Sequence, residues 1–170
     1  PNISSSPEAL FINCCDTNPL SVDPYEIINI EKDSFDKGLE TIKQLFDCDI
    51  HLTYQNNNFD NTLSGINYHQ FTGPHPAGLV GTHISKIHPV NLNSKVWTVN
   101  FQDLISIGYL KKNKKIKTTK IISLGGPAVF EPSLIKVRHG SNLDEITAGK
   151  IEDNSRVISG SVLHGNESEG

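Results

Sequence analysis

The residues best placed to do chemistry lie between Gly73 and His83, in the sequence Gly-Pro-His-Pro-Ala-Gly-Leu-Val-Gly-Thr-His. Glycine-rich turns that lead from a strand into a helix often bind phosphate, because backbone N–H groups and the helix dipole point outward there. This glycine-rich segment contains neither the dinucleotide pattern G-x-G-x-x-G nor the phosphate-loop pattern G-x-x-x-x-G-K-[ST]. Its candidate packing or ligand-contact residues are Gly73, His75, Gly78, Gly81 and His83.

The same segment also predicts a helix with a surface of small residues. Gly78 and Gly81 share this surface with Ala77, Thr82 and Ser85. Small side chains let another backbone approach closely. We favour this close-packing role over a bound anion or cofactor.

Histidine is the second residue type that could form a site. Four of the seven histidines, His69, His75, His83 and His88, lie within twenty residues. A zinc site needs three or four ligands that converge on one point, and the helical pattern H-E-x-x-H is absent. His83 and His88 would lie roughly 140° apart around a helix. We therefore expect hydrogen-bonded structural histidines and no metal site.

The three cysteines predict no disulfide framework. Cys14 and Cys15 are adjacent, which seldom closes an unstrained bridge, and Cys48 leaves an odd number. Cys14 could act as a nucleophile only with a histidine partner in space, and no local pattern marks one. We expect small, reduced thiols, as in a cytoplasmic protein, and the sequence identifies no catalytic residue.

Six lysines fall between Lys111 and Lys120, around Asn113. Such a run could contact an anionic lipid surface, at roughly 1 kcal/mol for each lysine close to it. The alternative is a solvated hairpin tip, with Asn113 in a turn that joins two strands. Both interpretations remain open at the level of sequence.

Strand and helix patterns alternate before the lysine run. Apolar runs predict strands at residues 9–12, 49–54, 68–71 and 95–100, with a polar connection at 56–58. Helices are expected at 34–46, where Asp33 is the predicted N-cap, at about 75–87, and at 102–110. This alternation predicts an α/β layered domain over residues 1–117.

The remainder, residues 118–170, predicts a small α+β module. Strands are expected at 121–124, 134–137 and 156–159, with a short helix capped by Ser141 or Asn142. The end, Asn166 to Gly170, has the composition of a flexible tail.

The bulk properties exclude several classes of protein. The chain has 170 residues, a net charge of −4, no apolar run long enough to span a membrane and no signal-peptide pattern. This charge does not indicate a nucleic-acid partner. The sequence contains no methionine, so we expect a fragment of a longer polypeptide.

Four segments resemble the A subunit of the sodium-translocating NADH:quinone reductase. They are Asp16 to Leu20, the glycine-rich segment, Phe101 to Gly108 and Arg156 to Leu163, in this order along the chain. The resemblance implies a Rossmann-like three-layer domain followed by a β-grasp module of the soluble-ligand-binding type. It also implies distant kinship with the flavin-carrying subunit of respiratory complex I and with the C subunit of the Rnf complex. A glycine-rich flavin loop and a cysteine cluster are absent here, which implies that an ancestral cofactor site is lost.

The family resemblance further implies a peripheral subunit on the cytoplasmic face of the bacterial inner membrane. The whole complex oxidises NADH, reduces ubiquinone and exports Na⁺, with its flavins and iron–sulfur centres in other subunits. The implied partners are the membrane subunits and the missing N- and C-terminal domains. For this portion we expect a structural role near the quinone-reducing end, with no cofactor of its own. The alternatives are a nucleotide- or flavin-binding domain that uses the turn from Gly73 to Gly81, and direct quinone binding by Tyr68, His75 or His83.

Overall fold

A computed structural model describes residues 5–55, 59 and 63–168 of the chain. The chain divides into two compact units. Unit 1 comprises the residues up to Thr17 and Asp23–Ile116, and unit 2 comprises Asn18–Val22 and Lys117–Gly170. The predicted connection at 56–58 and the ends of the chain at 1–4 and 169–170 lie outside the described residues. None of the described helices is long and apolar enough to cross a membrane.

Unit 1 is built on a parallel four-stranded sheet with the order β3-β2-β1-β4. The strands are β1 (Ala9–Cys14), β2 (Asp49–Tyr54), β3 (Asn67–Gln70) and β4 (Val96–Asn100). The apolar run of β1 is almost completely buried, as expected for a central strand that is covered on both faces. The edge strands β3 and β4 are partly exposed and more polar.

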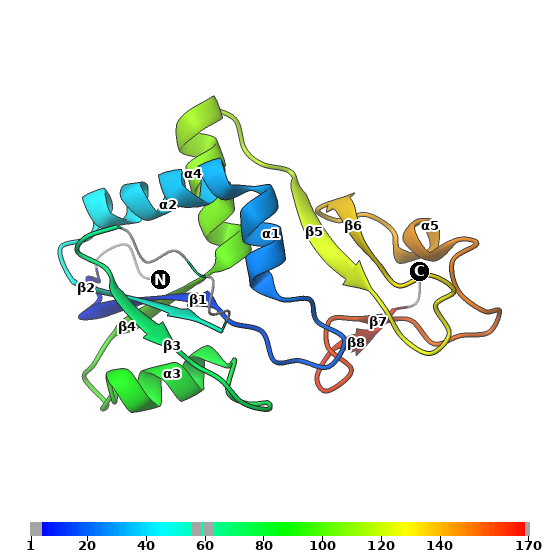
Figure 1. The fold of residues 1–170 in the computed structure, drawn as a ribbon, viewed down its shortest axis with the longest axis horizontal. Coiled ribbons are helices and arrows are strands. Elements are labelled where there is room, and N and C mark those ends of the chain that lie inside the picture. Colours follow the sequence, from blue (N-terminus) through cyan, green and yellow to red (C-terminus); the bar gives the residue numbers. More distant parts are fainter. Residues whose placement is uncertain (1–4, 56–58, 60–62, 169–170) are drawn as a thin grey trace. The chain divides into compact units, whose positions relative to one another are not determined.

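Helices cover both faces of this sheet (Figure 1). One face carries α1 (Pro24–Ile30), α2 (Lys32–Leu45) and α4 (Phe101–Asn113), which contact one another, and the other carries α3 (Val80–Ile87). Unit 1 is therefore a three-layer α/β structure with a parallel sheet, in agreement with the predicted fold class at this level.

The contact between α2 and α4 is made close by two glycines. A Cβ on Gly108 would meet the carbonyl oxygen of Ser34, and a Cβ on Gly38 would meet that of Leu104. The two backbones therefore approach in a way that no larger residue allows. Close packing of this kind was predicted for the glycine-rich segment and not for Gly38 and Gly108.

Two predicted features of the helices in unit 1 are wrong, and one helix was missed. The helix α3 begins at Val80 and not near His75, because backbone bonds from Ala77 N to the Pro74 oxygen and from Leu79 N to the Pro76 oxygen form successive turns there. Asp33 lies in the first turn of α2 and does not cap it, since the N-cap is Glu31 without a side-chain bond. The helix α1 was not predicted; Asp23 caps it and Pro24 begins it.

The hairpin interpretation of the lysine run is also wrong. Residues Lys111 to Asn113 form the last turn of α4, and the backbone N–H of Lys114 donates to the Leu110 oxygen. The Asn113 side chain donates to the Tyr109 oxygen and so stays within the helix. Lysine is a good helix former, and cations near the carboxyl end favour the helix dipole, so the helix runs past the predicted end at Leu110.

Unit 2 contains two small antiparallel sheets and one short helix. The elements are β5 (Thr119–Leu124), β6 (Ser133–Arg138), α5 (Leu143–Thr147), β7 (Ile158–Ser159) and β8 (Asn166–Glu167). β5 pairs with β6 and β7 with β8. Asn142, one of the two predicted caps, is the N-cap of α5. Asn166 and Glu167 pair with β7 rather than forming a flexible tail, since backbone pairing holds them.

Candidate functional site

The glycine-rich segment lies against the carboxyl end of β1 and is held by one side chain from this strand and one from the residues that follow it. The Asn13 side chain donates to the Gly78 oxygen at 3.1 Å, and the Gly78 N–H donates to Thr17 Oγ1 at 2.9 Å. Asn13 Oδ1 in turn accepts from the backbone N–H of Cys15 at 2.9 Å. Both backbone polar groups of Gly78 are therefore satisfied inside unit 1.

Gly78 is required at its position by space. A Cβ there would lie 2.7 Å from Thr17 N and 2.8 Å from Thr17 Oγ1. Gly81 differs, because a Cβ there would meet nothing within 4 Å. Gly73 has a φ of 126°, a left-handed conformation that favours glycine. The three glycines of the segment thus serve a close contact, an open surface and a turn.

The two histidines of the segment have different environments. His75 Nδ1 lies 3.3 Å from Thr17 Oγ1, in a partly buried position. His83 is fully buried, with its ring centroid 4.1 Å from that of Phe71, and its Nε2 lies 2.7 Å from the Ala77 oxygen. A carbonyl oxygen only accepts, so we assign the proton to Nε2 and leave Nδ1 bare. Nδ1 has no hydrogen-bond partner among the described residues.

Burial lowers the pKa of His83, and the bond to Ala77 only partly offsets this effect. The ring is therefore neutral, and it forms a hydrogen bond between α3 and the turn before it. The bond ties the helix to the turn that contains Gly78.

A second histidine pair was not predicted. His51 Nδ1 on β2 and His69 Nε2 on β3 lie 3.0 Å apart across the sheet. Burial lowers the pKa of both rings, and the neighbouring His69 lowers that of His51 further. His51 lies outside the run of four histidines, so only strand pairing could reveal this contact. No group of three or more metal-ligating side chains occurs among the described residues.

The cysteines next to the segment have the environment of structural thiols. Cys14 and Cys15 are both buried. Burial raises the pKa of Cys14 well above its usual value and raises that of Cys15 to about 12. Both thiols stay protonated at neutral pH, and only a thiolate attacks. Burial also raises the pKa of Cys48, and the charges of Asp49 and Asp47 add to the effect.

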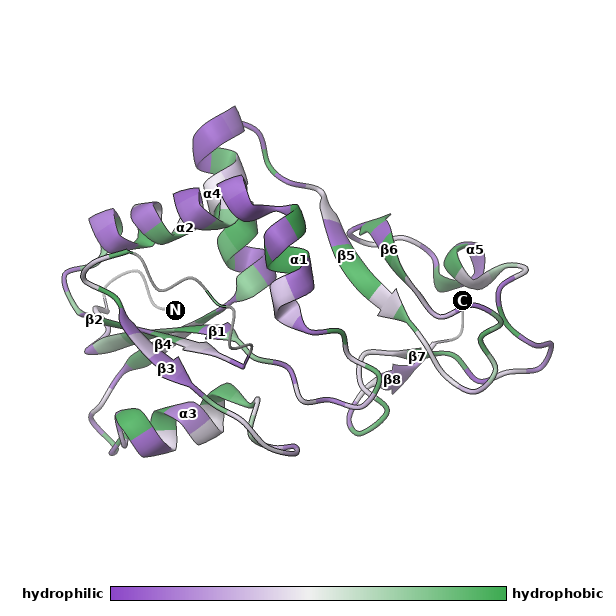
Figure 2. Ribbon diagram, viewed as in Figure 1, coloured by the Kyte–Doolittle hydropathy of each residue, from purple (hydrophilic) through white to green (hydrophobic). Residues whose placement is uncertain are grey.

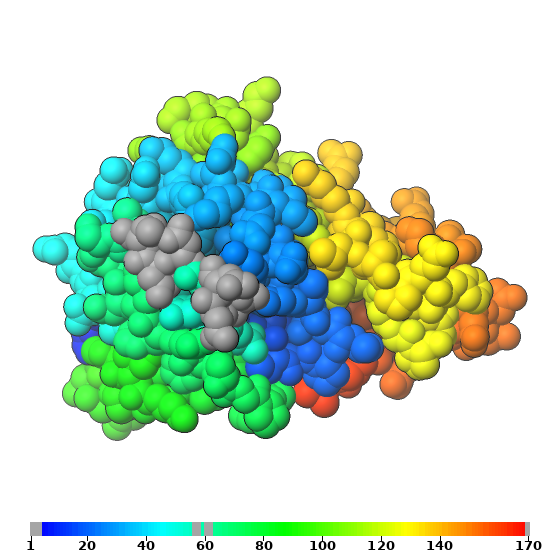
Figure 3. All heavy atoms as spheres, in the orientation of Figure 1, coloured from blue at the N-terminus to red at the C-terminus, as the bar shows by residue number. Residues whose placement is uncertain are grey.

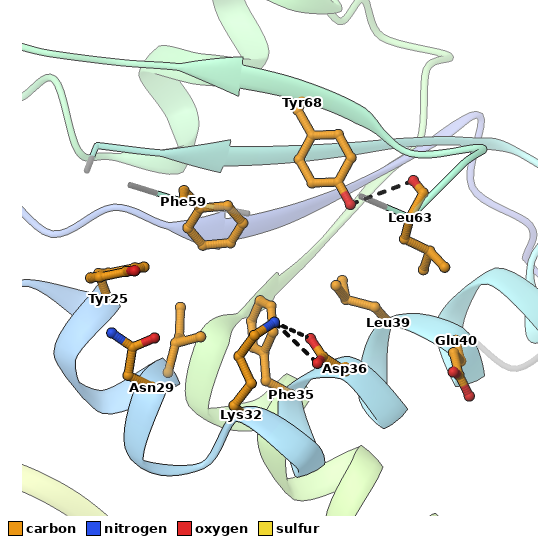
Figure 4. A pocket seen from close by; sticks show the side chains of 11 residues that line it. Tyr25, Asn29, Lys32, Phe35, Asp36, Leu39, Glu40, Phe59, Leu63 and Tyr68 are labelled. Atoms are coloured by element: carbon orange, nitrogen blue, oxygen red, sulfur yellow. Dashed lines mark hydrogen bonds and ion pairs between the residues drawn. The ribbon is translucent and has the colours of Figure 1, made fainter. Parts of the chain in front are cut away.

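A cavity of about 220 Å³ lies between the helices α1 and α2 and the edge of the sheet (Figure 4). It is lined by Tyr25, Ile28, Asn29, Lys32, Phe35, Asp36, Leu39, Glu40, Phe59, Leu63 and Tyr68. Phe59 contacts the rings of Tyr25, Phe35 and Tyr54. Lys32 and Asp36 pair at 2.9 Å, so these two charges satisfy each other.

The residues considered for quinone binding do not line one cavity. Tyr68 belongs to the lining shown in Figure 4 and donates to the Leu63 oxygen at 3.5 Å. His75 and His83 are not part of this lining, because they contact Thr17 and Ala77. Of these three alternatives, only Tyr68 lines this cavity.

The comparisons with known proteins match two family models, one before and one after the boundary near residue 117. Residues 1–116 match a family model described as the NqrA second alpha/beta domain, and residues 121–170 match the NQRA C-terminal domain. These matches together cover both units.

Three relatives are named as the A subunit of the Na(+)-translocating NADH-quinone reductase. The protein of Klebsiella pneumoniae (strain 342) is 43% identical over 176 residues, covering 100% of this chain and 39% of that protein. The protein of Mannheimia succiniciproducens is 41% identical, covering 100% of this chain and 38% of that protein. The protein of Neisseria meningitidis serogroup B is 42% identical, covering 100% of this chain and 39% of that protein. The chain spans about two fifths of the length of these relatives. Because these two family models match nearly the whole chain, and the identities to the relatives agree with them, the chain belongs to the NqrA family.

Proposed function

We propose that this chain is the middle portion of the peripheral A subunit of a complex that transfers electrons from NADH to ubiquinone and exports Na⁺. Its own role is assembly and positioning near the quinone-reducing end, on the cytoplasmic face of the bacterial inner membrane. The name shared by its relatives supports the activity of the whole complex. The partners are other subunits, above all the membrane subunits, and further domains of the same polypeptide.

The Rossmann-like and β-grasp assignments belong to this proposal. Unit 1 has the strand order β3-β2-β1-β4 with helices on both faces, which corresponds to the first four strands of the doubly wound dinucleotide-binding fold. Residues 118–170 pair a β-hairpin with one short helix, which is compatible with a small β-grasp module. The first domain covers residues 1–117.

The observation that supports the assembly role is that both backbone polar groups of Gly78 form hydrogen bonds within unit 1. In a phosphate-binding turn the glycine N–H groups point toward the ligand. Here the N–H of Gly78 is bonded to Thr17, and its carbonyl is bonded to Asn13. The turn is built to hold α3 on the sheet. We infer that this portion carries no cofactor, and that flavins and iron–sulfur centres belong to other subunits.

A single open position offers a sharp test of the assembly role. Gly81 lies in the first turn of α3, where a Cβ would meet nothing within 4 Å, so we expect Gly81→Leu to preserve the fold of unit 1. If this surface packs against a partner, the variant assembles less well into the complex, as measured by co-purification of the other subunits. The matched control is Lys95→Leu, an exposed position outside the segment. Normal assembly of Gly81→Leu would contradict a packing role for this surface.

Calorimetric titration of the chain tests the absence of cofactor chemistry. We expect no heat of binding with FMN, NADH or a soluble ubiquinone analogue. Micromolar binding of FMN or NADH would overturn the assembly role in favour of nucleotide binding. Binding of the quinone analogue alone would place part of the acceptor site in this portion of the polypeptide.

A further inference from the structure

The end of α4 carries a concentrated positive charge. Four lysines, Lys111, Lys112, Lys114 and Lys115, form a lysine cluster in which every side chain is exposed. Figure 2 shows the hydrophilic end of this helix beyond its more hydrophobic middle, and Figure 3 shows this end at the surface, above α2 in the view. The whole chain has a net charge of −4, so this positively charged cluster is opposite in sign to the protein as a whole.

Helix stability explains only half of the cluster. Lys111 and Lys112 lie in the last turn of α4, where cations favour the helix dipole. Lys112 also pairs with Asp33 at 2.9 Å. Lys114 and Lys115 follow the last turn, and neither forms an ion pair in the described part of the chain. No contact with an acidic side chain described in unit 1 therefore explains their charge.

The backbone at Lys114 makes the choice of residue more informative. Lys114 is the C-cap of α4 and has a φ of 56°. Glycine is the residue that ends helices in this left-handed conformation without strain. Stability alone would therefore favour glycine at this position, whereas the chain has a charged lysine there.

Apolar side chains border the lysines. Leu110 is 47% exposed and Ile116 is 78% exposed. Lysines together with aliphatic side chains on one exposed end match the two layers of a lipid surface, with anionic headgroups outside and acyl chains beneath. A protein partner fits less well, because lysine is depleted in protein–protein interfaces while arginine is enriched, and the cluster contains no arginine.

We propose that the end of α4, from Leu110 to Ile116, contacts the anionic headgroups of a lipid bilayer. The lysine cluster supplies the electrostatic attraction, and Ile116 reaches the boundary of the acyl layer. This contact orients unit 1 on the membrane surface independently of any protein partner.

Co-sedimentation of the chain with vesicles tests the proposal. The vesicles contain phosphatidylcholine with phosphatidylglycerol at roughly one lipid in three, against phosphatidylcholine alone as the neutral surface. We expect binding to the anionic vesicles only, weakened by added salt. The double variant Lys114→Gln/Lys115→Gln should bind about 25-fold more weakly, at roughly fivefold for each lysine. Ile116→Ser should weaken binding without changing the salt dependence.

The matched control is Lys86→Gln/Lys95→Gln, which makes the same change in net charge at exposed positions elsewhere in unit 1. It should bind nearly as well as the unchanged chain. Lys114→Gly separates stability from binding, because it relieves the left-handed backbone and should raise thermal stability while weakening vesicle binding about fivefold. Failure of the unchanged chain to bind anionic vesicles at low salt overturns the proposal. Equal losses in both double variants, or binding to polyglutamate but not to vesicles, also overturn it.

Discussion

At the scale of single residues, unit 1 uses histidines with lowered pKa values as buried or half-buried structural groups. His83 donates to a backbone oxygen, and His51 and His69 meet across two strands. The contact between His51 and His69 needs one ring nitrogen without a proton, and burial lowers the pKa of His83. The seven histidines of the sequence could not by themselves show which ones were buried, because burial depends on which strands and helices come together.

These histidines predict a stability that falls in mild acid. Burial lowers the pKa of all three rings from the usual 6.5, so the unfolded chain binds more protons below that value. Their contribution is complete above pH 6.5 and is lost as the pH falls from there toward the folded pKa values. Urea unfolding across this range should show a decreasing free energy of unfolding.

The variant His83→Gln checks the assignment to a particular ring. Glutamine can still donate to the Ala77 oxygen but does not titrate. Its unfolding free energy should therefore depend less on pH than that of the unchanged chain. An identical pH dependence would show that His83 does not contribute.

The glycines of the glycine-rich segment predict opposite effects for one substitution. Gly78→Ala places a Cβ against Thr17 and should lower the free energy of unfolding by about 1–3 kcal/mol. Gly81→Ala meets no neighbour and should raise it by up to about 0.5 kcal/mol through helix propensity. Chemical denaturation measures both, and equal losses in the two variants would contradict the contact between Gly78 and Thr17.

At the scale of elements, α4 packs closely on α2. Gly38 and Gly108 allow it, because each lies against a backbone carbonyl oxygen of the other helix. Helix periodicity identified the apolar face of α2, since Phe35, Leu39 and Ile42 are buried. Periodicity does not identify the glycine at which two helices touch.

This contact predicts that Gly108→Ala is severely destabilising. The added methyl group meets the Ser34 oxygen and backbone of α2, which cannot move without separating the helices. We expect a loss of about 3 kcal/mol or more in unfolding free energy. Thermal unfolding measures it, with Gly81→Ala as the control. A loss below that of Gly78→Ala would contradict the close approach.

At the scale of the whole molecule, the two units differ in their cores. Unit 1 buries the central strand and the inner faces of its helices. In the described part of unit 2, only Ile121 and Thr147 are buried. A segment with few buried apolar side chains opens at a lower free energy.

Hydrogen exchange should therefore differ between the units. We expect amides of β5 and β6 to exchange faster than those of β1 and β2 under native conditions. Ile121→Ala should accelerate exchange in unit 2 and leave β1 unchanged. Equal protection of the two units, measured by mass spectrometry, would contradict a weak core in unit 2.

The sequence by itself determined the local elements and the family. Apolar runs located β1 and β2, periodicity located α2, and Asn142 located the start of α5. These signals are local, because strand and helix patterns repeat every two or 3.6 residues. The resemblance, carried by motifs along the chain, was confirmed by the family matches.

The tertiary structure decided the contacts that depend on distant residues. Gly78 meets Thr17 across 61 positions, His69 meets His51 across 18, and Lys112 meets Asp33 across 79. The observed start of α3 differs from the predicted one for the same reason, because Asn13 and Thr17 hold the turn that precedes it. Such pairs follow from strand order and helix packing, and no local pattern of residues encodes them.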